Sequence, residues 1–63
     1  MKDTIALISI VEGASRLGIS KFTLRSWIRL GVIPHVRLRR RVLLDPRDLD
    51  RFIQASRIEA RSR

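Results

Sequence analysis

Two short stretches of this 63-residue chain, each opened by a serine and closed by a glycine, most constrain how it can fold. The first runs from Ser9 to Gly18 and the second from Ser20 to Gly31. A serine hydroxyl accepts a hydrogen bond from an amide in the first turn of a helix, and a glycine readily adopts the left-handed conformation that ends one. The spacing therefore predicts two short helices joined by a tight turn, which is the pattern of a helix-turn-helix.

The first of these helices should begin at Ile10. Ser9 and Glu12 have the spacing of a capping box, in which each side chain accepts a hydrogen bond from the other residue's amide. Apolar residues recur at helical spacing along one face, and these are Ile10, Ala14 and Leu17. Gly13 lies inside the helix, where glycine costs about 1 kcal/mol relative to alanine, so we expect it to weaken this element.

The second helix, over residues 21–30, separates apolar from basic side chains. One sector of its helical projection holds Leu24, Trp27 and Ile28, and the opposite sector holds Lys21, Phe22, Arg25, Ser26 and Arg29. We predict that the apolar sector packs in the core and that the basic sector contacts DNA. Trp27 is accordingly expected to pack rather than to stack on a base. For Phe22 two alternatives stay open, a contact with a thymine methyl group or packing against the first helix.

The net charge of +8 is concentrated in one segment. Residues 15–41 contain eight basic residues and no acidic one, while residues 1–14 sum to −1 and residues 42–63 to +1. The eight are Arg16, Lys21, Arg25, Arg29, Arg37, Arg39, Arg40 and Arg41. We interpret this block as a face that binds a polyanion, the alternative being a solvated surface kept for solubility. Twelve arginines against two lysines favour bidentate contacts with phosphate or guanine.

After Pro34 the apolar residues alternate with polar ones, which is typical of strands. Val36 and Leu38 alternate first, and Val42 and Leu44 repeat the pattern, so we predict a hairpin with its tip at residues 39–41. Neither glycine nor asparagine marks this tip, and we therefore expect a loop longer than a tight two-residue turn. A basic hairpin beyond a helix-turn-helix is a wing, whose arginines would contact phosphates or the narrow minor groove.

The sequence predicts a last helix that opens at Asp45 as cap and Pro46 as first helical residue, with Asp48 in its first turn. Its packing face comprises Leu49, Phe52 and Ile53. From about Arg57 the chain could prolong this helix or fray. We therefore expect one domain over residues 1–57 and a basic tail over residues 58–63.

The composition argues against several other kinds of protein. With no cysteine and His35 as its one histidine, the chain offers no metal site, and it has no phosphate-cradling glycine loop. We expect no enzyme, no catalytic residue and no cofactor. The apolar run over residues 5–11 is short and follows Asp3, unlike a secretory signal, and no stretch reaches the ~20 apolar residues needed to span a bilayer. We therefore expect a cytoplasmic protein with no membrane partner.

The order of helix, turn, helix, hairpin and helix, from about Leu7 to Ile53, resembles the excisionase-type branch of the MerR-like winged helix-turn-helix domains. The residues that carry the resemblance are Ser9-Ile10-Val11-Glu12, Ala14, Leu17-Gly18-Ile19-Ser20, Thr23-Leu24, Ile28-Arg29, Gly31, Ile33-Pro34, Val36-Arg37-Leu38, Arg40-Arg41 and Asp48-Leu49. It implies a mainly α fold with a small β-hairpin. Longer MerR-type regulators continue into a dimerisation helix and an effector domain that this sequence lacks, so no small-molecule effector is implied.

The resemblance also implies which residues meet DNA. On the recognition helix they are Lys21, Thr23, Arg25, Ser26 and Arg29, and on the wing Arg37, Arg40 and Arg41. To these we add neighbours on the same elements, Ser20, Phe22 and Arg39, and a candidate phosphate contact, Arg16. Phe22 stands where a small polar residue is usual, and Arg39 stands where a glycine commonly forms the wing tip.

Three functions are compatible with these features. The resemblance implies an excisionase, or recombination directionality factor, which binds and bends double-stranded DNA near the attachment site of a tyrosine or serine integrase. The alternative is a small transcriptional regulator of a phage or mobile element. An RNA-binding module fits the composition, but the major groove of A-form RNA is too narrow for a helix. Because the sequence has no dedicated dimerisation helix, we expect monomers that associate cooperatively on DNA.

Overall fold

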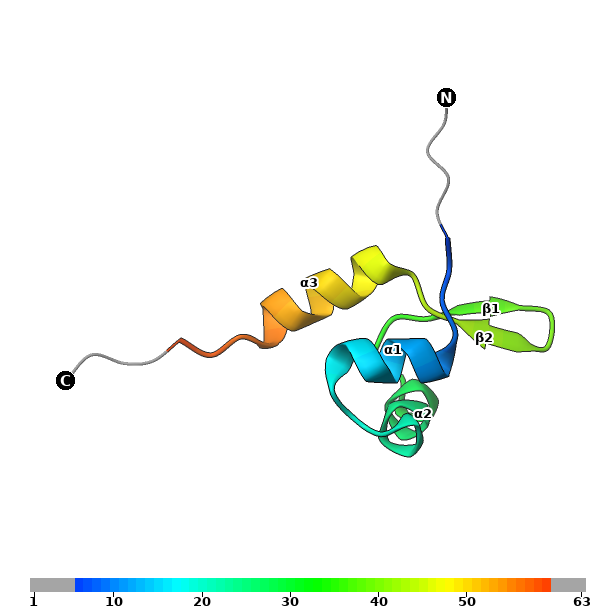
Figure 1. The fold of residues 1–63 in the computed structure, drawn as a ribbon, viewed down its shortest axis with the longest axis horizontal. Coiled ribbons are helices and arrows are strands. Elements are labelled where there is room, and N and C mark those ends of the chain that lie inside the picture. The colour runs from blue at the N-terminus through cyan, green and yellow to red at the C-terminus, as the bar shows by residue number, and fades with distance from the viewer. Residues whose placement is uncertain (1–5, 60–63) are drawn as a thin grey trace, which may run out of the picture.

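The fold consists of three helices and one two-stranded antiparallel hairpin. The computed structural model describes residues 6–59, and its elements follow in the order α1 (Ile10–Leu17), α2 (Lys21–Leu30), β1 (Val36–Leu38), β2 (Arg41–Leu43) and α3 (Pro46–Ser56). Figure 1 shows α1 and α2 close together, with the hairpin extending away to one side and α3 to the other. This is the winged helix-turn-helix that the sequence predicted.

Ser9 and Ser20 cap the N-termini of α1 and α2 as expected. The Ser9 hydroxyl accepts a hydrogen bond from the Glu12 amide at 3.1 Å, and the Ser20 hydroxyl accepts one from the Thr23 amide at 3.0 Å. The predicted capping box is only half formed, because the Glu12 carboxylate lies 3.7 Å from the Arg16 guanidinium instead of bonding to the Ser9 amide. The N-terminus of α1 therefore has one side-chain cap, and Glu12 forms a surface ion pair instead of a second cap.

Two glycines end these helices in the left-handed conformation. Gly18 and Gly31 both have φ of 74°, and the amide of each donates to carbonyl groups in the last turn of its helix. An L-residue with a β-carbon adopts this region at a cost of about 1 kcal/mol or more. Gly18 avoids this cost and so allows a tight turn between α1 and α2. The Ile19 amide also donates a hydrogen bond of 3.0 Å to the Ala14 carbonyl.

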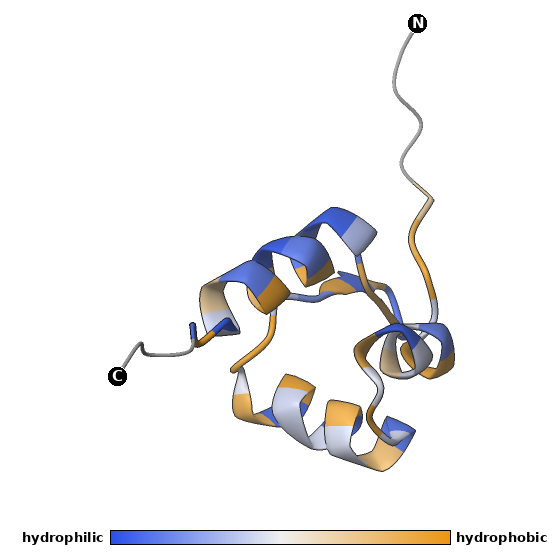
Figure 2. Ribbon diagram, turned by 60° about the vertical axis from the view of Figure 1, so that its left-hand side comes forward, coloured by the Kyte–Doolittle hydropathy of each residue, from blue (hydrophilic) through white to orange (hydrophobic). Residues whose placement is uncertain are grey.

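The core lies where α1, α2, the end of the hairpin and the start of α3 meet. Its buried side chains are Ile8, Ala14, Leu24, Ile33, Leu44 and Leu49. Figure 2 shows the hydrophilic outer side of α3 and the apolar patches that turn toward the rest of the fold. Ile8 and Leu44 form an isolated antiparallel bridge with amide-to-carbonyl distances of 2.8 and 2.9 Å. The segment before α1 is thereby joined to the segment before α3.

The tip of the hairpin differs from the sequence prediction. Leu38 pairs with Arg41, which leaves Arg39 and Arg40 as a two-residue turn in place of the longer loop that we expected. Arg39 has φ of 57°, the left-handed region in which glycine or asparagine is usual. The prediction was wrong because an arginine takes this conformation at a cost of about 1–2 kcal/mol, which the pairing of the two strands offsets.

Helix α3 begins as predicted and packs through part of its expected face. The Asp45 carboxylate accepts a hydrogen bond from the Arg47 amide at 2.9 Å, and Leu49 is buried. Ile53, expected on the packing face, is 39% exposed. The helix does not continue through residues 57–59, where Ile58 is 92% exposed, and the last four residues of the expected tail lie outside the described part of the chain. None of the helices described is long and apolar enough to cross a membrane.

Candidate nucleic-acid interface

Helix α2 presents the basic face that its sequence pattern predicts. Lys21, Arg25 and Arg29 are all exposed along it. The other polar candidates are less free, since the Ser20 hydroxyl also donates to the Thr23 hydroxyl at 3.0 Å. Thr23 and Ser26 are partly buried. The three cations are therefore the long, exposed donors of this face.

Phe22 lies on the same face and is 71% exposed. The Lys21 ammonium nitrogen is 5.5 Å from the centroid of its ring. Of the two alternatives that the sequence left open, packing against the first helix is therefore wrong. The ring points to solvent from the first turn of α2 instead.

A cleft of about 380 Å³ runs between α2 and the hairpin. Three arginines line it, Arg25 and Arg29 from α2 and Arg37 from β1, and no acidic side chain does. The remaining lining residues are Ile10, Ile28, His35 and Val42. The fold thus brings arginines of two different elements, α2 and β1, to one concave surface. Guanidinium groups around such a hollow suit an anion held at its mouth.

His35 belongs to this cleft, although the sequence pattern gave it no role beyond a rejected metal ligand. Its Nδ1 lies 3.0 Å from the Ile33 carbonyl oxygen, which fixes the ring beside the start of β1. The signal that could have placed it is its position between Pro34 and the first strand, where the chain must turn from α2 into the hairpin. Within the described residues, no group of acidic or histidine side chains could hold a metal ion with it.

Of the ten arginines within residues 6–59, three have a carboxylate partner within 4 Å and seven, including Arg57 after α3, have none. Three outside the recognition helix and wing have carboxylate partners: Arg16 with Glu12, Arg47 with Asp45 at 3.0 Å, and Arg51 with Asp48 at 3.4 Å. Among residues 6–59, the arginines of α2 and the hairpin have no carboxylate within 4 Å. These are Arg25, Arg29, Arg37, Arg39, Arg40 and Arg41. A charge without an internal partner keeps its full capacity to bind an external anion.

Arg16 differs from the other candidates because it is already paired. Its bond to Glu12 is an exposed (i, i+4) ion pair, of a kind worth about 0.3–0.5 kcal/mol. So small a stabilisation is easily exchanged for a phosphate. The position on α1, next to the turn, remains suited to such a contact.

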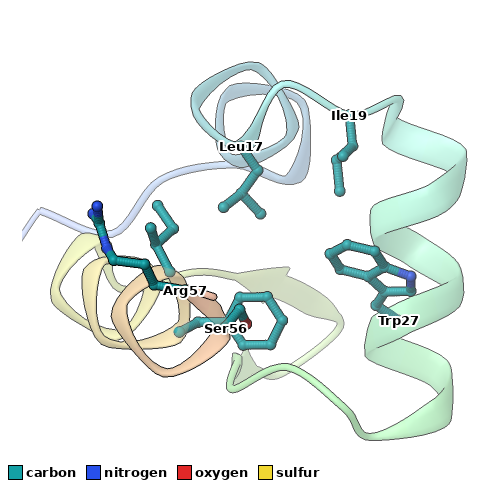
Figure 3. A pocket seen from close by; sticks show the side chains of 7 residues that line it. Leu17, Ile19, Trp27, Ser56 and Arg57 are labelled. Atoms are coloured by element: carbon teal, nitrogen blue, oxygen red, sulfur yellow. The ribbon is translucent and has the colours of Figure 1, made fainter. Parts of the chain in front are cut away.

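Trp27 turns away from the basic face. Its ring centroid is 5.9 Å from that of Phe52 on α3, with the planes tilted by 46°. Figure 3 shows the ring beside an apolar groove of about 330 Å³ that Leu17 and Ile19 also line. The groove and the basic cleft share no residue. This geometry supports packing, not base stacking, as the role of Trp27.

A family model described as a helix-turn-helix domain matches residues 7–57. The match spans all three helices and the hairpin. Comparison with curated proteins and with solved structures gives no match.

Proposed function

Since the chain belongs to the family of helix-turn-helix domains and is a DNA-binding protein, we propose that it acts as an excisionase. In this role it binds and bends double-stranded DNA beside the attachment site of an integrase and so directs recombination toward excision. The family includes excisionase-like DNA-binding proteins, which supports this role. A transcriptional regulator of the same fold would share the binding mechanism and differ in what the bound DNA is used for.

The observation that carries the proposal is that, within the described fold, the arginines of α2 and the hairpin have no carboxylate partner, whereas those of α1 and α3 do. The planar guanidinium fork matches both a phosphate and the O6 and N7 acceptors of guanine. Duplex DNA supplies both kinds of acceptor on one surface, which is why we assign the unpaired group to it.

In the proposed complex, α2 enters the major groove with its first turn toward the base edges, and the hairpin follows the backbone. The cleft lined by Arg25, Arg29 and Arg37 supports this arrangement because both elements contribute guanidinium groups to it. Arg25 would read a base, and the wing residues Arg40 and Arg41 would anchor the backbone. The phosphate contacts of Arg40 and Arg41 would set affinity and position but carry no sequence information directly.

A domain this small has low sequence specificity when it binds as a single copy. A single DNA-binding module of this kind buries roughly 600–1,000 Å² of surface, and its one recognition helix reaches only a few base pairs, so we expect a lone copy to discriminate poorly. We propose that several copies bind side by side on repeated half-sites and bend the DNA between them. Smooth bending over 20–30 bp costs on the order of a few kcal/mol, which contacts from several basic hairpins can offset.

Substitution of two arginines tests the division into readers and anchors. Arg25→Ala should relax base preference at one position of a selected duplex by ~1–3 kcal/mol. Arg40→Ala should weaken binding to all duplexes alike and lower the slope of log affinity against log salt by about one unit. Equal weakening of specific and random DNA by Arg25→Ala would contradict the assignment.

Bending and excision test the function itself. We expect a monomer in sedimentation without DNA, cooperative binding to direct repeats, and position-dependent mobility of circularly permuted fragments. Addition of the chain to an integrase and its attachment sites should stimulate excision over integration. Tighter binding to RNA than to duplex DNA of matching sequence would overturn the proposal. A stable free dimer that leaves DNA straight would instead favour the regulator.

A further inference from the structure

Phe22 exposes a large apolar ring in the first turn of α2. It is the second residue of the helix, two positions after the cap Ser20, and it is 71% exposed while Leu24 is fully buried. An exposed ring adds little to the stability of the fold, because most of its apolar surface stays in water. Burial in the core therefore does not account for a phenyl ring at this position.

Basic groups lie next to this ring. The Lys21 ammonium lies 5.5 Å from the ring centroid, and Arg25 is exposed one turn further along the helix. Any polyanion drawn to these cations is therefore brought against the ring as well. Phe22 lies within the basic face and shares its ligand.

The chemistry of the major groove determines what a phenyl ring can recognise there. The first turn of a recognition helix is the part that contacts base edges. Those edges present hydrogen-bond donors and acceptors, which a phenyl ring cannot satisfy, and one apolar group, the C5 methyl of thymine. Resting on the proposed function, we propose that Phe22 determines specificity by contacting the methyl group of a thymine.

Replacement of single thymines by deoxyuridine tests this contact, because deoxyuridine lacks only the methyl group. A preferred duplex is first selected from a random-sequence pool with the full chain, and each thymine is then replaced in turn. The parent protein should lose about three- to fivefold in affinity at one of these positions, as expected for one buried methyl group. Phe22→Ala should bind the thymine duplex more weakly and bind the thymine and deoxyuridine forms equally.

Leu30→Ala provides the matched control. Leu30 is 69% exposed on the same helix but lies at its opposite end, so this variant should keep the discrimination between the two bases. Both variants should melt like the parent, since neither side chain is in the core. A parent protein that ignores every replacement, or a Phe22→Ala variant that still discriminates, would overturn the inference alone. If no preferred duplex emerges from the pool, the proposed function fails first.

Discussion

Gly13 lies directly against the side chain of Leu44. A β-carbon built on Gly13 would collide with Cδ1 of Leu44 and would lie 3.4 Å from Cδ2 of Leu24. Leu24 and Leu44 are both fully buried, so neither can easily move aside. The glycine that weakens α1 by its helix propensity is therefore what allows this helix to approach the centre of the core.

Gly13→Ala should destabilise the protein although alanine is the better helix former. Overpacking of a tight core costs about 1–3 kcal/mol, and the gain in helix propensity is about 1 kcal/mol. We expect a net loss of up to about 2 kcal/mol in the free energy of unfolding by urea. Ser15→Ala, at an exposed position of the same helix, should raise stability slightly and serves as the control. A Gly13→Ala protein at least as stable as the parent would contradict this prediction and show that Leu44 can repack around the added methyl group.

The contact between Trp27 and Phe52 should be a main link between α2 and α3. Trp27→Ala should cost about 2–4 kcal/mol, less than for a fully buried tryptophan, because the ring borders an open groove. A double-mutant cycle with Phe52→Ala should give a coupling of about 0.5–1.5 kcal/mol. If Trp27→Ala melts like the parent yet loses DNA binding, the ring contacts DNA and our assignment is wrong.

Arg39→Gly should separate stability from DNA binding. Glycine adopts the φ of 57° without strain, so the variant should be more stable by about 0.5–1 kcal/mol. It should also bind duplex DNA more weakly, with a smaller salt dependence, because one cation of the wing is lost. Thermal unfolding and titrations at several salt concentrations measure the two effects.

The neighbouring residue provides the control for this strain. Arg40 does not have positive φ, so Arg40→Gly should lower stability by about 0.5–1 kcal/mol while losing the same charge. Opposite changes in stability with similar losses in binding would assign the strain to Arg39. Equal changes in stability for the two variants would refute it.

Asp45 should contribute to a loss of stability in acid. Hydrogen bonds from the Arg47 side chain, and then from its amide, hold the pKa of this carboxyl below the 3.8 of a free aspartate. The contribution is therefore fully present above that value and is lost as the pH falls through the lower pKa of the folded state. Asp45→Asn keeps a capping side chain but removes the charge. The stability difference between parent and variant should shrink below about pH 4, and a constant difference would contradict this account.

Most of the fold could be predicted because its signals are local. Ser9, Ser20 and Asp45 each cap a helix through bonds that span two or three residues, and Gly18 and Gly31 end helices by their own conformation. Such signals can be read from a short window of sequence. The same is true of the basic face of α2, which follows from helical spacing.

What the sequence did not give depends on contacts between distant residues. The environment of Phe22 could not be decided until α1 was placed, and the cleft containing His35 exists only because the hairpin folds beside α2. The need for glycine at position 13 appears only when Leu44 is packed against it. The two-residue turn was missed because Arg39 occupies a left-handed position where glycine or asparagine is usual, so residue preferences alone argued against it.

The bridge between Ile8 and Leu44 has a consequence for the order of folding. Each helix and the hairpin can form from residues close in sequence, but this bridge joins Ile8, before α1, to Leu44, after the hairpin. Closing so long a loop loses entropy before any contact compensates it, which makes non-local pairing slow. Helix α2 can therefore exist as a nascent, locally formed element well before the domain acquires its final rigidity.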